Sequence, residues 1–279
     1  MQVDSIAEQL FFTTVRVDTI AQDGGAGSGT AFLFSYKRGE TNYPFVVTNK
    51  HVVMGMREGM LSFMQKQDNA PQLGKGFDLR IDDWQDTWFG HPSPDIDIAI
   101  CPFAPLEDHI KKQYCLDLFY RYVSDEMIPT VEQAAKLDAL ESVTFIGYPN
   151  GIWDSKNLLP VARRGMTASP ISVDFENTPR FLIDASVFGG SSGSPVFLMN
   201  QGMYTDKTGG TIIGSRLFFV GVIAAVFFRT QFNQIVAVPI PTQVQPMAQQ
   251  QEMIDLGIVF KARTVVETIE AFLKAKNVT

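Results

Sequence analysis

The densest cluster of turn-forming residues in the chain is Phe188-Gly189-Gly190-Ser191-Ser192-Gly193-Ser194-Pro195-Val196. Glycines on both sides of a serine permit a tight turn in which successive backbone N–H groups converge. Such a turn can present a hydroxyl group and can also bind the oxyanion that forms when this hydroxyl attacks an acyl group. Taken alone, the segment is equally explained as a Gly/Ser turn that leads into a strand. Other parts of the chain decide between these interpretations.

The same segment contains the G-x-S-x-G pattern of the α/β-hydrolases, in which Ser191 would be the nucleophile. That fold requires an acid and then a histidine downstream of the serine. The chain has three histidines, His51, His91 and His109, and no histidine follows residue 109. The α/β-hydrolase interpretation is therefore excluded.

Among the three histidines, His51 has the most suitable position for chemistry. It follows the β-branched run Val46-Val47-Thr48, so we expect it where a buried strand ends and turns. His91 lies in a loop-like Gly/Pro segment and His109 lies on an expected helix, so both are expected to be solvated. Since a lone histidine is more often structural than catalytic, position alone assigns no role to His51.

Two acids alternate with aliphatic residues in Asp95-Ile96-Asp97-Ile98-Ala99-Ile100. In a strand, both carboxylates would share one face. We expect Asp95 to face water at a sheet edge. Asp97 continues directly into the apolar residues, so we expect it to be buried against a cation or an imidazole.

Short β-rich segments with glycine-rich turns occur in two stretches, which predicts two similar antiparallel β units. Helical spacing between Pro105 and Leu140, with a capping box from Thr130 to Gln133, predicts a helical insertion. An apolar stripe from Val265 to Leu273 predicts a surface helix that packs on the second unit. The expected strands of the second unit are Val143–Ile146, Phe181–Asp184, Val196–Leu198, Leu217–Phe228 and Ile235–Val238. The expected divisions are 1–104 (N-terminal barrel with the His and Asp), 105–141 (helical linker), 142–241 (C-terminal barrel with the Ser) and 242–279 (helical tail).

Composition narrows the classes of function. The 279 residues carry a formal charge of -7, so no basic field attracts nucleic acid. The longest apolar run, Leu217–Phe228, is shorter than the roughly 20 residues that span a bilayer as a helix, so no membrane association is expected. Cys101 and Cys115 are expected to be buried reduced thiols, with a disulfide between them as the alternative. With no signal-peptide charge order in residues 1–10, we expect a cytoplasmic protein.

His51, Asp97 and Ser192 occur in the order His, Asp, Ser, which is the order of the chymotrypsin arrangement. Over residues 10–240 the sequence resembles the trypsin-like (chymotrypsin-fold) serine peptidases, especially the intracellular bacterial ones. The segments that carry this resemblance are Gly27-Ser28-Gly29-Thr30-Ala31-Phe32, Val47-Thr48-Asn49-Lys50-His51-Val52-Val53, Asp97-Ile98-Ala99, Ile146-Gly147-Tyr148-Pro149 and Gly190-Ser191-Ser192-Gly193-Ser194-Pro195. The resemblance implies an all-β fold of two six-stranded antiparallel β-barrels, with a helical insertion between them and a C-terminal helix.

The resemblance also implies a role for each site residue. Ser192 would be the nucleophile, and His51 would be the general base and then the general acid. Asp97 would hold the tautomer of the imidazole and stabilise its cation. The backbone N–H groups of Gly190 and Ser192 would form the oxyanion hole. No metal or other cofactor is expected.

Two departures from the secreted trypsins bear on regulation. Val52 follows His51 where those enzymes have a disulfide-forming cysteine, which agrees with a reducing compartment. Ser191 precedes the expected nucleophile where their zymogens have the aspartate that pairs with a new N-terminus, and the Ile-Val-Gly-Gly start is missing as well. Activation by N-terminal cleavage is therefore not expected.

By the same resemblance, the residue six positions before the nucleophile, Ser186, lies at the base of the primary pocket. Without a carboxylate there, a basic substrate side chain would be desolvated unpaired. Val226 stands where members with large pockets have glycine, so we expect a narrow pocket. We predict a preference for small or medium uncharged side chains before the cut bond.

The sequence thus predicts a cytosolic serine endopeptidase that acts on polypeptides through an acyl-enzyme intermediate. Two alternatives stay open: a non-catalytic protease-like module that binds a partner, which belongs to another class of function, and a gated effector that is active only with a partner. An esterase would share the chemistry and differ in the acyl group. Because a constitutively active cytosolic protease would endanger its host, we expect a regulatory protein partner or narrow specificity.

Overall fold

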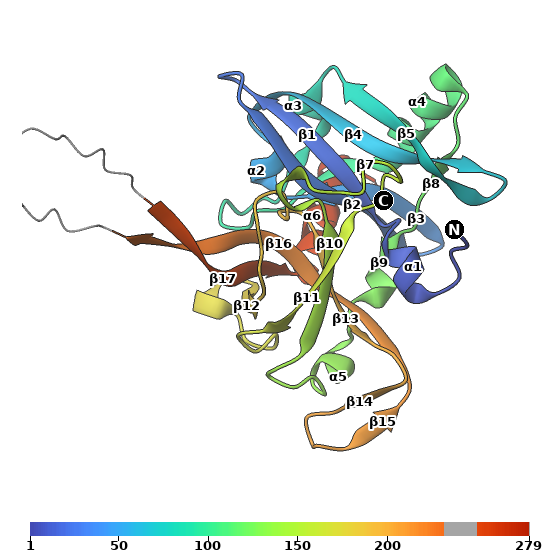
Figure 1. Ribbon diagram of the computed structural model, residues 1–279. Helices are drawn as coiled ribbons and strands as arrows, with labels where there is room; N and C mark the ends of the chain where they lie inside the picture. The colour runs from blue at the N-terminus through green and yellow to red at the C-terminus, as the bar shows by residue number, and fades with distance from the viewer. Residues whose placement is uncertain (232–249, 279) are drawn as a thin grey trace, which may run out of the picture.

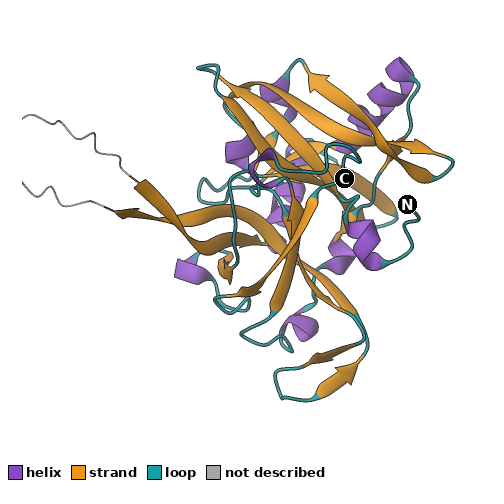
Figure 2. Ribbon diagram, in the orientation of Figure 1, coloured by secondary structure: helices purple, strands orange, loops and turns teal. Residues whose placement is uncertain are grey.

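The computed structural model describes residues 1–231 and 250–278, with side chains described for residues 1–227 and 255–278. Strands dominate the molecule, and the helices lie around the sheets and between them (Figure 2). Two β units follow each other along the chain, one built from β1–β9 and the other from β10–β17 (Figure 1). The mostly-β fold and its division into two β units confirm the expected fold class.

The first unit is a nine-stranded sheet in the order β5-β4-β1-β2-β3-β7-β6, with β8 paired to β4 and β9 paired to β2. Its strands are β1 (Thr14–Ala21), β2 (Ala26–Arg38), β3 (Thr41–Thr48), β4 (Met56–Gln67), β5 (Ala70–Ile81), β6 (Phe89–Gly90), β7 (Ala99–Pro102), β8 (Leu118–Phe119) and β9 (Val123–Ser124). A six-stranded barrel was expected here, so the strand number and the closure differ from the prediction. The extra strands β6, β8 and β9 have two residues each, too few to show a period-2 pattern in the sequence.

The second unit is a closed barrel in the order β10-β11-β12-β17-β16-β13, which confirms the six strands expected for it. Its strands are β10 (Ser142–Gly147), β11 (Val161–Thr167), β12 (Arg180–Asp184), β13 (Pro195–Asn200), β16 (Arg216–Gln231) and β17 (Gln250–Lys261). A separate two-stranded arm consists of β14 (Met203–Thr205) and β15 (Thr211–Ile213). The barrel interior is apolar, with Phe145, Phe181 and Val259 fully buried in one cluster.

The expected boundary of the C-terminal tail is wrong. Residues 242–279 were assigned to a helical tail, but β17 extends to Lys261 and pairs with both β12 and β16. The tail helix starts only at Arg263. The expected strand Ile235–Val238 and the boundary at 241/242 lie outside the described residues.

The linker between the units is partly helical, as expected, and also contributes β8 and β9. Its capping box is confirmed: the Thr130 hydroxyl accepts from Gln133 N, and the Gln133 side chain accepts from Thr130 N. The helices and helical turns of the chain are α1 (Ile6–Leu10), α2 (Lys50–Val53), α3 (Trp84–Thr87), α4 (Phe103–Tyr114), η1 (Asp125–Met127), α5 (Val131–Ala134), η2 (Pro149–Gly151), η3 (Phe175–Asn177) and α6 (Arg263–Ala275). None of the described helices is long and apolar enough to span a membrane.

The C-terminal helix α6 holds the two units together. Its apolar stripe is buried as expected, with Val265 and Ile269 in a cluster that also includes Phe32 of β2. The ring of Phe272 packs edge-to-face on Phe45 of the first unit, with centroids 5.7 Å apart. The helix therefore contacts both units, whereas the sequence predicted packing on the second unit alone.

The two cysteines differ in their exposure to solvent. Cys101 is buried in the first unit, and burial raises the pKa of its thiol to about 12. Cys115 is exposed at the end of α4, where it adopts a left-handed backbone conformation with φ of 54°. Both thiols are free, so the expectation of two buried thiols holds for Cys101 and is wrong for Cys115.

Candidate active site

His51 is placed by the junction between β3 and the short helix α2. The strand ends at Thr48, and the next residues turn into a single helical turn that begins at Lys50. Asn49, at the turn, is fully buried and donates from Nδ2 to the backbone carbonyl of Asp97, at 2.6 Å. The end of the strand is therefore tied directly to the segment that carries the acid.

His51 and Asp97 form a two-point contact. The backbone N–H of His51 donates to Oδ1 of Asp97 at 3.1 Å, and Nδ1 of the imidazole lies 2.5 Å from Oδ2. An ionised carboxylate can only accept hydrogen bonds, so Nδ1 carries the proton and Nε2 of the neutral ring keeps its lone pair. The side chains are 50% and 27% exposed respectively, which leaves the ring accessible from outside.

Asp97 reaches this position from a loop, because β7 begins only at Ala99. The expected strand over residues 95–98 is therefore wrong, although the two predicted environments hold: Asp95 is exposed, and Asp97 is half-buried against an imidazole. Lys50 donates from Nζ to the carbonyl of Ser93 at 2.7 Å and so fixes the same loop. Burial lowers the pKa of Lys50, an effect that the charges of Asp97 and Asp95 oppose.

The loop with Ser192 packs against the first unit at Thr30 of β2 and at Thr48, the last residue of β3. A Cβ atom on Gly193 would lie 1.8 Å from the Thr30 carbonyl oxygen and 2.5 Å from Oγ1 of Thr48. Gly193 also has φ of +87°, a left-handed conformation that favours glycine. Only glycine therefore lets the loop approach this closely. One of the two residues it approaches, Thr48 of β3, lies three residues before His51 in the chain.

Ser192 itself is held from both sides. Its carbonyl accepts from the backbone N–H of Thr30 at 2.9 Å, and its hydroxyl donates to the carbonyl of Ala224 on β16 at 3.3 Å. Within the described part of the chain, no hydrogen bond joins Ser192 to His51. The structure thus joins two of the three predicted catalytic side chains directly and brings the loop of the third to the same strand ends.

The two N–H groups predicted for the oxyanion hole make no hydrogen bond within the described residues. The carbonyl of Gly189 accepts from Asn150 N, and the carbonyl of Ser191 accepts from Ser194 N at 3.0 Å. No peptide bond among the described residues is cis, so each N–H points opposite to the carbonyl of the same peptide unit. The N–H groups of Gly190 and Ser192 therefore point away from these two contacts, and their role as an oxyanion hole stays a prediction.

Thr30 is a site residue to which sequence reasoning gave no role. Its fully buried hydroxyl donates to the Gly190 carbonyl at 2.9 Å and accepts from Tyr148 N at 3.0 Å. Together with the contact from its N–H to Ser192, these bonds connect the first unit to both ends of the oxyanion segment. The signal was present in the motif Gly27–Phe32, but no pattern in one sequence indicates which distant backbone groups a threonine will bind.

We expect Thr30→Val, which keeps the shape and removes the hydroxyl, to destabilise the fold and to slow any hydrolysis. Two buried backbone groups lose their partner, which costs about 1–3 kcal/mol each. Displacement of the Gly190 segment should also lower kcat by about tenfold or more. Thermal unfolding and steady-state kinetics measure both effects. Thr30→Ser keeps the hydroxyl and should retain most of the stability and rate; equal losses in both variants would contradict the role of the hydroxyl.

The predicted pocket residues lie at one end of the barrel. Ser186 is exposed, in the segment between β12 and the Ser192 loop. Val226 is half-buried against the barrel core and pairs with Gly257 of β17. A Cβ atom on Gly257 would meet the side chain of Val187 at 2.9 Å, so the β16–β17 pair lies directly beside the residue that follows Ser186.

The other histidines do not join the site. His109 is exposed on α4, as expected. His91 is not freely solvated: its Nδ1 accepts from Ser93 N at 3.0 Å, and its Nε2 lies 3.5 Å from a carboxylate oxygen of Glu267. No group of three metal-ligating side chains occurs among the residues that the structure describes.

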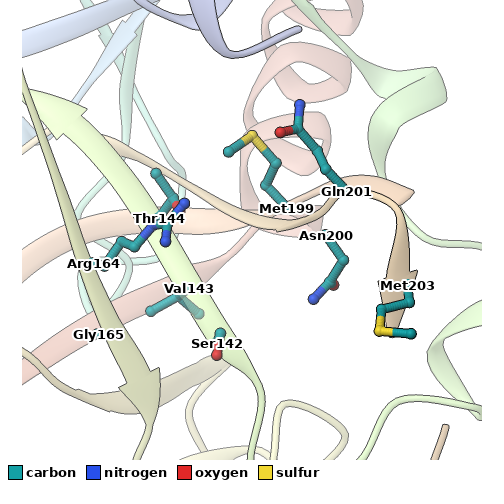
Figure 3. A pocket seen from close by; sticks show the side chains of 9 residues that line it. All are labelled: Ser142, Val143, Thr144, Arg164, Gly165, Met199, Asn200, Gln201 and Met203. Carbon is teal, nitrogen blue, oxygen red and sulfur yellow. The ribbon is translucent and has the colours of Figure 1, made fainter. Parts of the chain in front are cut away.

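A cavity of about 390 Å³ lies between β10, β11 and the segment that joins β13 to β14 (Figure 3). Its walls include Thr144, Arg164, Asn200 and Met203. None of the three predicted catalytic residues lines it, and it contains no histidine or nucleophilic cysteine. We therefore do not assign the candidate active site to this cavity.

Each of the two β units carries part of the candidate active site. A closed six-stranded barrel carries Ser192, and the adjacent sheet carries the hydrogen-bonded pair of His51 and Asp97. The fold is chymotrypsin-like.

No family model matches the sequence, and no curated protein matches it. Three of the solved structures with a similar backbone are two proteases and one protease paralogue. The Rv3671c protease from M. tuberculosis (active form) has a TM-score of 0.45 and 17% identity, over 95% of this chain and 82% of that chain. The thermostable serine protease AL20 from an extremophilic microorganism has a TM-score of 0.47 and 13% identity, over 94% of this chain and 97% of that chain. The scabies mite inactivated protease paralogue S-I1 has a TM-score of 0.45 and 14% identity, over 95% of this chain and 97% of that chain.

Proposed function

We propose that the protein is a serine endopeptidase that cleaves polypeptides through His51, Asp97 and Ser192. The observation that carries this proposal is the two-point contact between His51 and Asp97, which leaves Nε2 of the imidazole as the free basic nitrogen. A histidine held in this tautomer beside a serine loop is the arrangement that activates a hydroxyl for acyl transfer. A purely structural histidine would not need an accessible Nε2.

In the proposed mechanism, Nε2 of His51 takes the hydroxyl proton of Ser192 while Oγ attacks the scissile carbonyl carbon. Before this step the hydroxyl must leave the Ala224 carbonyl, which is a weak contact at 3.3 Å. The imidazolium that forms is stabilised by the carboxylate of Asp97. It then gives its proton to the leaving amine, and the acyl-enzyme remains on Ser192.

The negative charge on the carbonyl oxygen would be bound by the N–H groups of Gly190 and Ser192. One such preorganised donor contributes about 3–4 kcal/mol to transition-state stabilisation. Water activated by the same His51 nitrogen then attacks the acyl-enzyme and releases the second product.

The primary pocket would take a small or medium side chain before the cut bond. Ser186 offers no negative charge to a basic side chain, and Val226 on the opposite wall narrows the pocket. We also propose that the protein works in the cytoplasm on a polypeptide substrate, without nucleic acid, membrane or cofactor. A regulatory protein partner or narrow specificity would limit its activity there.

A direct test is incubation of catalytic amounts of the protein with a diverse peptide library, with products identified by mass spectrometry. We expect internal peptide bonds to be cut with many turnovers per enzyme molecule. Peptide binding without cleavage would favour the non-catalytic module, and turnover that appears only after addition of cell extract would favour the gated effector. Hydrolysis of small esters without any peptide cleavage would favour the esterase.

A further inference from the structure

An arginine that has no ion-pair partner among the described residues lies beside the proposed primary pocket. Arg163 is on β11, where the neighbouring residues Ala162 and Arg164 are exposed and Arg163 is half-buried. Its guanidinium lies over the ring of Phe145, a fully buried residue of the barrel core, 5.4 Å from the centroid. Arg163 therefore points to the inner face of the barrel, and Arg164 points to the outer face.

Among the described residues, no carboxylate forms an ion pair with the guanidinium of Arg163. Its Nη1 atom is buried without a hydrogen-bond partner among those residues. Burial lowers the pKa of Arg163, and the charge of Asp255 opposes this effect from beyond ion-pair distance. Burying a charged donor without a hydrogen-bond partner is costly, so an incoming anion that binds the guanidinium would remove this cost.

The contact with Phe188 places this cation next to the segment that contains Ser186, and a backbone hydrogen bond places Asp255 beside the same segment. On one side, the guanidinium lies 4.8 Å from the ring centroid of Phe188, two residues after Ser186. On the other side, the carbonyl of Asp255 accepts from the N–H of Ala185 at 2.9 Å. Because Phe188 also bonds through its carbonyl to Ser191 N, the same short segment leads directly to the nucleophile.

We propose that Arg163 is a specificity-determining residue that selects an acidic side chain, Asp or Glu, immediately before the cut bond. This inference rests on the proposed endopeptidase function and names its substrate class. The pocket keeps the size limits set by Ser186 and Val226, and the expected preference for uncharged side chains is replaced by one for carboxylates. A planar guanidinium with free N–H donors matches a carboxylate in both charge and geometry.

Three peptides that differ only in the residue before the cut bond, Glu, Gln or Lys, test the proposal. Glu and Gln have nearly the same shape, so their ratio isolates the charge. We expect kcat/KM for the Glu peptide to exceed that for the Gln peptide by about tenfold or more, and Lys to be the poorest. A Gln or Lys peptide that is cut as well as the Glu peptide would overturn the inference and leave the endopeptidase function intact. In the Lys case, Asp255 would be the residue that faces the substrate.

A matched pair of variants assigns the preference to one side chain. Arg163→Gln should reduce the ratio of kcat/KM for the Glu peptide to that for the Gln peptide to about one, mainly because the Glu peptide reacts more slowly. Arg163→Lys should keep part of the preference for the Glu peptide. Arg164→Gln makes the same change in charge one residue away on the outer face and should leave the ratio unchanged. A ratio that survives in Arg163→Gln, or is lost in Arg164→Gln, would contradict the assignment.

Binding separates failure of this inference from failure of the proposed function. The Ser192→Ala chain should bind a fluorescent peptide that ends in Glu about tenfold more tightly than its Gln-ended counterpart, as measured by fluorescence anisotropy. If the wild-type protein cuts no peptide but this difference is found, the endopeptidase proposal fails and the acidic pocket stands. Equal affinities, or no binding of either peptide, would overturn the acidic pocket.

Discussion

Ser192→Ala is expected to lower kcat for a cleaved peptide by about 10⁴-fold to 10⁶-fold. The variant removes the only atom that can form the acyl-enzyme, so neither His51 nor the oxyanion N–H groups can compensate. Stability should hardly change, because the hydroxyl makes one long hydrogen bond, to Ala224 at 3.3 Å. Steady-state kinetics and thermal unfolding of the purified variant measure the two effects.

Ser191→Ala is the matched control for this result. The Ser191 hydroxyl is fully buried and has no hydrogen-bond partner in the described structure, so its removal should leave activity intact and stability unchanged or slightly higher. An inactive Ser191→Ala chain together with an active Ser192→Ala chain would show that the nucleophile has been placed one residue too late.

Asp97→Asn is expected to lower kcat by about 10⁴-fold while the fold is preserved. An asparagine can donate its amide proton to Nδ1 of His51, which favours the tautomer with the proton on Nε2. In that tautomer the imidazole cannot accept the hydroxyl proton of Ser192. The loss should therefore appear in kcat, and circular dichroism should report an unchanged fold.

Asp95→Asn gives the comparison for this variant, with the same chemical change two residues earlier. Asp95 is exposed and makes no hydrogen bond or ion pair to His51, so the rate should stay within about threefold of the wild type. Similar losses in the two variants would contradict the assignment of Asp97 as the partner of the imidazole.

The sequence predicts the barrel better than the sheet because the two units differ in strand length. The barrel strands β10, β12 and β13 contain compact apolar runs, which are visible without a structure. The first unit recruits two-residue strands from loops and from the linker, and their pairing depends on tertiary contacts. The strand β17 is harder to predict because it begins with the polar residues Gln250, Gln251 and Glu252 and shows a compact apolar run only near its end.

In the candidate site, the order of His51, Asp97 and Ser192 along the chain was enough to predict the contact between His51 and Asp97, and the role of Ser192 stays a prediction. The order was not enough to predict the local structure, because Asp97 reaches His51 from a loop and not from a strand. Thr30 and Arg163 act through contacts with residues far away in the sequence, at Gly190 and Phe188. Such contacts follow from the packing of the two units and of the barrel strands, which a single sequence does not display.

Reaction with a fluorophosphonate probe tests the central claim most directly, since the probe bonds covalently to an activated serine and needs no knowledge of the substrate. The account predicts one probe molecule per chain, attached to Ser192 as identified by mass spectrometry of the digested protein, and no labelling of Ser192→Ala or Asp97→Asn within the same time. A native, folded chain that stays unlabelled, or one that carries the probe on a serine other than Ser192, would contradict the proposed active site.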